Sequence, residues 1–131
     1  MNKTCVSGRL VKDPKVRYTP NGKILCQFTL AVQREYKNAE GNYVADYIPV
    51  VLWRNSAEVA GNNLSKGNKI LVEGRIQTRS YVDKQNIRRW VTELVGRHFE
   101  YMFSAPGNKY IQNDENPFEN IPMPDIDEIT F

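Results

Sequence analysis

The alternation of hydrophobic and polar residues predicts a protein built mainly of β-strands. In residues 23–33, KILCQFTLAVQ, apolar side chains recur at every second position, which is the period of a strand with one buried face. Residues 46–54 are rich in β-branched and aromatic side chains, and residues 68–82 alternate again. Together the patterns predict five strands, at residues 3–11, 23–33, 46–54, 68–82 and 88–103.

Single positions within these strands predict local geometry. Pro49 has no backbone amide to donate, which indicates an edge or a bulge at that point. Gly74 lies in the middle of a strand, where a strongly curved sheet could bend. The alternation around it places Ile70, Val72 and Ile76 together on one face.

Only residues 55–67 predict a helix. Asn55 and Glu58 have the spacing of a capping box, Ala57, Ala60 and Leu64 share one helical face, and Gly67 is a suitable stop. Three strands, one short helix and two more strands is the order of the OB-fold, a small and partly open five-stranded Greek-key barrel. A β-sandwich is the alternative, but a helix between the third and fourth strands favours the barrel.

Charge divides the chain into a basic body and an acidic end. Residues 1–103 contain 17 Lys and Arg against nine Asp and Glu, a net charge of +8, whereas residues 104–131 carry −5. From about Ser104 the strand pattern stops and prolines and asparagines dominate, which predicts a disordered segment. The charge division suggests a polyanionic partner for the body and a separate role for the end, although a solvated surface would give the same charges.

Several classes of protein lack their sequence signature here. No apolar run is long enough to span a membrane and the N-terminus does not resemble a signal peptide, so a soluble intracellular protein is expected. Cys5 and Cys26 lie among apolar strand residues and are expected to be buried free thiols. With His98 as the single histidine, and no phosphate-binding loop, we expect no metal, no cofactor and no enzymatic activity.

Aromatic residues recur beside cations, a pattern that suits single-stranded nucleic acid. Such a strand exposes both phosphates and base faces, and stacking on a ring contributes about 1–3 kcal/mol per base. Tyr36 lies in a polar segment and Tyr81 follows Gln77 and Arg79 on a face predicted to be exposed, so both are expected to contact bases. Trp53 fits packing and stacking equally well. The remaining candidate rings are expected to pack within the protein: Tyr18, Trp90 and Phe99.

The longest matching segments resemble the bacterial and phage single-stranded DNA-binding proteins. They are NKTCVSGRLVKDPKVRYTPNGK, FTLAVQREYKN and DYIPVVLWRNSAEVAGNNLSKGNKILVEGRIQTRSY. The resemblance implies a cytoplasmic, nucleoid-associated homotetramer of OB-folds around which single-stranded DNA wraps during replication, recombination and repair. It implies stacking by Tyr36, Tyr47, Trp53 and Tyr81. It also implies phosphate contacts by Lys3, Arg9, Arg17, Arg34, Arg54, Arg75 and Arg79.

The same resemblance divides the chain into an OB-fold domain at 1–103, a disordered linker at 104–122 and an acidic tail at 123–131. In the family such a tail recruits partner proteins of replication, recombination and repair through its last residues. The corresponding residues here are Asp125, Ile126, Asp127, Glu128, Ile129, Thr130 and Phe131. The acids would approach a basic rim and the apolar side chains a hydrophobic pocket, whereas a purely solubilising tail would not need apolar residues at its end. Thr130 and Ile126 depart from the usual D-D-D-I-P-F ending.

Three alternatives share the predicted fold. One is an RNA-binding OB protein of the cold-shock kind, although those proteins are shorter and have compact aromatic motifs that are absent here. Another is a primosome-type accessory protein, which lacks an acidic tail ending in Phe. The third is a nuclease, for which the sequence contains no specific support.

Overall fold

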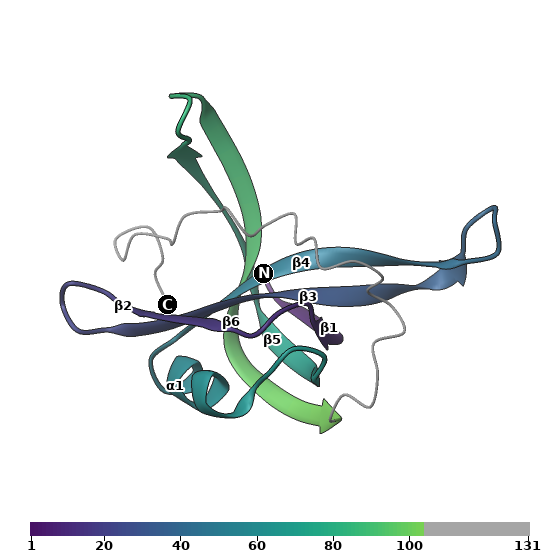
Figure 1. Cartoon of the computed structure of the whole chain (residues 1–131), viewed down its shortest axis with the longest axis horizontal. Coiled ribbons are helices and arrows are strands. Elements are labelled where there is room, and N and C mark those ends of the chain that lie inside the picture. Colours follow the sequence, from purple (N-terminus) through teal and green to yellow (C-terminus); the bar gives the residue numbers. More distant parts are fainter. Residues whose placement is uncertain (104–131) are drawn as a thin grey trace.

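A computed structural model describes residues 1–103 of the chain as six β-strands and one α-helix (Figure 1). Residues 104–122 and 123–131, predicted as linker and tail, lie outside the described residues. The elements are β1 (Thr4–Leu10), β2 (Lys15–Tyr18), β3 (Ile24–Lys37), β4 (Tyr43–Trp53), α1 (Arg54–Asn63), β5 (Lys69–Val82) and β6 (Arg88–Phe103).

Five of the strands form a closed barrel. The strand order is β1-β5-β6-β4-β3, and β1 returns to pair with β3 at Arg9 and Leu10. Four of these pairs are antiparallel, but β4 and β6 run parallel where Val50–Leu52 lie beside Leu94–Gly96. With α1 between β4 and β5, the predicted OB-fold is confirmed, and the closed barrel excludes the sandwich.

The sixth strand, β2, was not predicted. It pairs with the first residues of β3, and all four of its side chains are exposed. Its sequence KVRY alternates polar and apolar residues, but four residues are too few to distinguish a strand from a loop.

The barrel interior is built from the alternating positions of the long strands. Phe28, Leu30, Val50 and Leu52 point into one buried cluster with residues of β1, β5 and β6. Burial of each such side chain contributes about 1.5–3 kcal/mol, so this cluster is the main source of stability of the barrel.

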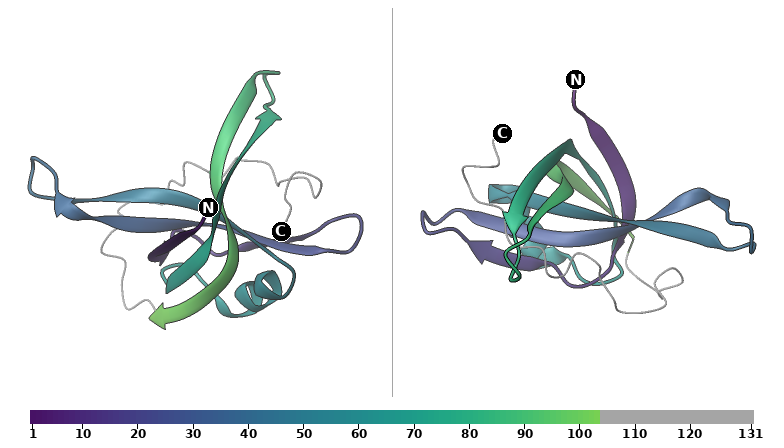
Figure 2. Two further views of the ribbon diagram at one scale, coloured as in Figure 1. Left: turned by 180° about the vertical axis from the view of Figure 1, so that it is seen from behind. Right: turned by 90° about the horizontal axis from the view of Figure 1, so that it is seen from above.

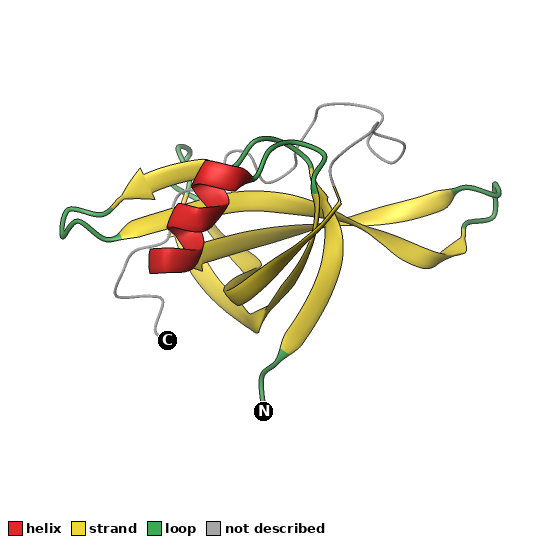
Figure 3. Cartoon of the chain, turned by 90° about the horizontal axis from the view of Figure 1, so that it is seen from below, coloured by secondary structure: helices red, strands yellow, loops and turns green. Residues whose placement is uncertain are grey.

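Helix α1 closes part of this core, but its N-terminus differs from the prediction. The helix lies beside the strands of the barrel (Figure 3). Ala57, Ala60 and Leu64 are buried in the core as expected. The helix begins at Arg54, and its N-cap residue is Trp53, with no side-chain hydrogen bond to the first turn. The predicted capping box at Asn55 is therefore wrong, because Asn55 already lies inside the helix.

Two hairpins extend well beyond the barrel as two-stranded arms (Figures 1 and 2). We call residues 33–46 the β3–β4 arm and residues 75–95 the β5–β6 arm. Each tip is held by one side-chain oxygen: Asn38 Oδ1 accepts from the amides of Glu40 and Asn42, and Asp83 Oδ1 accepts from those of Gln85 and Ile87. The arms are thus formed by ordinary strand pairing with closed turns at their ends.

Gly74 marks the point where β5 leaves the barrel. The register of β5 against β6 shifts between Glu73 and Gly74, and a Cβ at Gly74 would lie 2.1 Å from the carbonyl oxygen of Val95. The predicted bend at this glycine agrees with both observations. Beyond this bend Ile76 is exposed, although it continues the alternation that places the buried residues Ile70 and Val72 on one face.

Replacing Gly74 with alanine is expected to destabilise the protein by about 1–3 kcal/mol, since the added methyl group meets backbone that cannot rotate away. Chemical denaturation of Gly74→Ala beside the wild type measures this difference. Gly22→Ala is a less crowded comparison, because a Cβ there has no neighbour within 4 Å and only the positive φ opposes it. Equal stability of Gly74→Ala and the wild type would contradict the close approach.

The two cysteines occupy different environments. Cys26 is buried in the core, and burial raises the pKa of its thiol to about 12. Cys5 is an exposed free thiol on β1, so the expectation that it is buried is wrong. Within residues 1–103 no helix has the length and apolar character needed to cross a membrane.

Candidate nucleic-acid interface

The β3–β4 arm presents an exposed tyrosine beside an arginine. Between Gln33 and Lys37 the register of β3 against β4 shifts, so that three residues of β3 lie opposite Val44 alone. Bulges of this kind turn side chains out of the regular pleat. Tyr36 lies within the bulge and is 63% exposed. The phenol oxygen of Tyr36 accepts a hydrogen bond of 3.3 Å from Nη1 of Arg34.

Arg34 is at the same time held by a carboxylate of the neighbouring strand. Its Nε donates to Asp46 Oδ2 at 2.9 Å and its Nη2 donates to Asp46 Oδ1 at 2.7 Å, a bidentate pair. The hydrogen bonds from Arg34 lower the pKa of Asp46 below its ordinary value, so the carboxylate stays ionised at neutral pH. The predicted phosphate contact Arg34 is therefore exposed but already paired.

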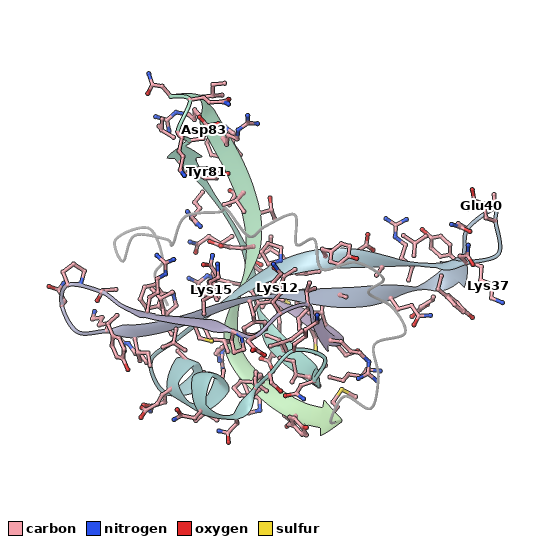
Figure 4. All side chains as sticks on the ribbon, in the orientation of Figure 1. Lys12, Lys15, Lys37, Glu40, Tyr81 and Asp83 are labelled. Carbon is pink, nitrogen blue, oxygen red and sulfur yellow. The ribbon has the colours of Figure 1, made fainter. Side chains whose placement is uncertain are left out.

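Further along the same arm a second tyrosine lies under a cation. Lys37 Nζ is 5.3 Å from the ring centroid of Tyr43, a cation–π contact, and Tyr43 is exposed. Lys37 and Glu40 lie at the end of this arm, far from the barrel (Figure 4). Tyr43 was not predicted as a site residue.

Tyr47 and Tyr81, both predicted stacking residues, are brought together between β4 and the β5–β6 arm. They line one pocket of about 450 Å³ together with Trp90 and Pro49. Tyr81 comes from the β5–β6 arm (Figure 4), whereas Tyr47 comes from β4. Residues 34 positions apart in the chain thus contribute rings to one open, largely apolar surface.

Trp90 is 71% exposed on the β5–β6 arm, so the expectation that it packs within the protein is wrong for the described chain. The same holds for Tyr18 on β2, while Phe99 packs against the core as expected. Both rings directly follow an arginine, Arg17 and Arg89, so the adjacent cation did not separate exposed rings from packed ones. Exposure in a strand depends on which elements cover it, and the local sequence does not carry that information.

Trp53 is buried rather than exposed. Its ring is 6% exposed and packs with Leu25, Val51 and Val95 in a second cluster outside the barrel core. The sequence left packing and stacking open for Trp53. In the described residues its side chain is packed.

Arg79 does not present its charge at the surface. Its Nε lies 2.7 Å from Glu93 Oε1, and the two side chains are 4% and 1% exposed. The second oxygen, Glu93 Oε2, is buried without a hydrogen-bond partner among residues 1–103. A phosphate could not reach this guanidinium without displacing the buried ion pair.

Two other predicted cations gather in a separate pocket. Lys3 and Arg75 line a pocket of about 290 Å³, to which Arg97 adds a third positive charge that was not predicted. Lys3 Nζ lies 3.5 Å from Glu73 Oε1, and Arg75 Nη2 donates to Gln77 Oε1 at 3.1 Å. The pocket is therefore basic, with three cations around one carboxylate.

The remaining predicted cations are spread over the barrel surface. Arg17 is exposed on β2, and Arg54 is exposed at the first residue of α1. Arg9 is half-buried, and its Nη1 donates to the carbonyl oxygen of Gly67 at 2.9 Å. Lys12 and Lys15 add positive charge to the central part of the molecule (Figure 4).

Metal ligation has little support in this part of the chain. No three His, Cys, Asp or Glu side chains within residues 1–103 are grouped so that they could hold a metal ion. His98 is exposed, with Nε2 lying 3.5 Å from Glu100 Oε1. His98 is therefore a surface residue.

Comparison with known proteins gives a consistent result. Residues 1–102 match the single-strand binding protein family. A protein of Clostridium acetobutylicum named single-stranded DNA-binding protein 2 is 43% identical, over 95% of this chain and 99% of that protein. Single-stranded DNA-binding protein 2 of Staphylococcus aureus strain COL is 43% identical over 92% of both chains. The single-stranded DNA-binding protein of Halalkalibacterium halodurans is 39% identical over 94% of this chain and 76% of that protein.

Proposed function

The chain belongs to the single-strand binding protein family, and on that premise we propose that it binds single-stranded DNA independently of base sequence. It acts by binding and not as an enzyme, in agreement with the family description and the names of its relatives. The DNA would contact rings and cations on the arms and on the adjoining barrel surface.

The observation that carries this proposal is the exposure of aromatic rings next to cations on two projecting arms. Tyr36 and Tyr43 lie on the β3–β4 arm beside Arg34 and Lys37. Tyr81 and Trp90 lie on the β5–β6 arm, beside a pocket that includes Tyr47. Exposed rings suit unpaired bases, because a duplex hides the faces on which rings would stack.

Titration with poly(dT), a DNA duplex and an RNA of equal length at two salt concentrations tests the proposal. We expect tight binding to poly(dT) that weakens steeply as salt rises, with weak binding to the duplex. Each phosphate neutralised on a single strand contributes a slope of about −0.7 to log K against log salt. A preference for RNA would support the cold-shock alternative, and degradation of labelled DNA would support a nuclease.

The proposal extends to assembly and cellular role. A homotetramer around which DNA wraps is the form that the resemblance implies, and light scattering of the purified full chain would give the mass of four copies. Protection of single strands during replication, recombination and repair, close to the nucleoid, is the corresponding role. The primosome-type alternative differs in lacking an acidic segment like residues 123–131.

Residues 123–131 are proposed to recruit partner proteins. Their alternating acidic and apolar side chains suit a pocket with a basic rim. Deleting this segment is expected to leave poly(dT) affinity equal to that of the full chain or slightly tighter, because a tethered acidic segment no longer competes for the basic body. Pull-down of a purified family partner should be lost. A large loss of DNA affinity, or unchanged recruitment, would contradict this assignment.

A further inference from the structure

We propose that the Arg34–Asp46 ion pair positions the ring of Tyr36 for base stacking, and that Arg34 does not serve as a phosphate contact. This inference rests on the proposed function, since it assigns roles within the same DNA-binding surface. It also gives Asp46, an acid on a surface expected to bind a polyanion, a positive role in binding.

Geometry fixes the orientation of the guanidinium. Asp46 lies on β4, outside the bulge of β3, and binds two of the three guanidinium nitrogens of Arg34 at 2.7 and 2.9 Å. Two parallel hydrogen bonds between planar groups leave the guanidinium little freedom to rotate. The third nitrogen, Nη1, is then directed at the Tyr36 phenol oxygen, 3.3 Å away.

Because Tyr36 lies in the bulge, a contact that orients its ring before binding would favour stacking. Tyr36 is 63% exposed on a two-stranded arm, where little packing restricts its rotamers. Ordering an exposed side chain on binding costs conformational entropy, and a side chain already held in place avoids part of that cost. A chain of contacts from Asp46 through Arg34 to Tyr36 would hold the ring before DNA arrives.

Charge also argues against Arg34 as a free phosphate contact. Asp46 neutralises the guanidinium at close range, so a phosphate would have to compete with a carboxylate that already occupies two of its donors. If phosphate binding were the main role of Arg34, removal of Asp46 would free the cation and strengthen DNA binding. The positioning role predicts the opposite sign, which makes the two roles separable.

The decisive variant is Asp46→Asn in the full chain, measured against poly(dT) at several salt concentrations. We expect affinity to fall about three- to tenfold, with the slope of log K against log salt unchanged. Arg34→Gln should give a loss of similar size. The double variant should be no weaker than either single variant, because both act through one contact chain.

Glu40→Gln is the matched control, since it removes the same charge from the same arm and Glu40 forms no ion pair within residues 1–103. It should leave affinity unchanged or slightly tighter. In a Tyr36→Ala background, Asp46→Asn should have no further effect, which a role in general stability would not produce. Thermal unfolding of each variant monitors folding.

Tighter binding by Asp46→Asn, with a salt slope steeper by about 0.7, would overturn the inference and return Arg34 to phosphate contact. An unchanged affinity, or an equal effect with and without Tyr36, would overturn it as well. Wild-type binding to poly(dT) is measured in the same series. Absence of wild-type binding would contradict the proposed function, whereas the variants test only the positioning of Tyr36 by Arg34 and Asp46.

Discussion

Glu93→Ala is expected to destabilise the protein by about 3–5 kcal/mol, the cost of leaving a buried charge without its partner. Arg79 and Glu93 are almost completely buried, and Arg79 Nε lies 2.7 Å from the carboxylate. Removing Glu93 would take this carboxylate away from the buried guanidinium of Arg79. Chemical denaturation of the variant and the wild type measures the loss.

The matched control replaces both charges with apolar side chains of similar size, as Arg79→Met with Glu93→Leu. Such replacements are often neutral or stabilising, because no charge remains to be desolvated. If this double variant is stable and binds poly(dT) with the wild-type salt slope, Arg79 is not a phosphate contact. A loss below 1 kcal/mol in Glu93→Ala would mean that the pair is more hydrated than its burial indicates.

The second large effect is on DNA binding. Replacing Tyr36 and Tyr81 together with alanine is expected to weaken poly(dT) binding by roughly 30-fold or more, since each stacked base contributes about 1–3 kcal/mol. The two rings lie on different arms, so their losses should add. Fluorescence titration at moderate salt measures the change.

Phenylalanine at the same two positions is the control, because it keeps the ring and removes only the hydroxyl. Tyr36→Phe with Tyr81→Phe should lose no more than the roughly three- to tenfold expected when the Arg34 contact to the Tyr36 hydroxyl is broken, well short of the loss in the alanine variant. Thermal unfolding of the alanine variant should resemble that of the wild type, since Tyr36 is exposed and Tyr81 half-buried. Unchanged occupancy of poly(dT) by a folded alanine variant would remove the stacking mechanism.

The sequence predicted the barrel well because its long strands bury one face. Residues such as Phe28, Leu30 and Val50 alternate, and alternation reports burial directly. The prediction was wrong where burial depends on distant elements. Beyond the bend at Gly74, Ile76 is exposed and Arg79 is buried on the same strand.

Contacts across strands were beyond sequence reasoning for the same reason. Arg34 and Asp46 are 12 residues apart and meet only because β3 and β4 pair with a bulge between them. Nothing in the segment QREYKN distinguishes an arginine that is paired from one that is free. The stacking role of Tyr36, by contrast, was suggested by its polar neighbours, and its exposure agrees with that reading.

The two-stranded construction of the arms has a consequence for how the molecule moves. Beyond the barrel each hairpin lacks a third strand and a core of its own, and isolated ribbons of this kind are only marginally stable. Amide hydrogens near the arm tips should therefore exchange with solvent quickly, while those of the barrel strands exchange at the rate of global unfolding. The two arms would therefore be flexible enough to follow an irregular single strand, while the barrel that holds them stays rigid.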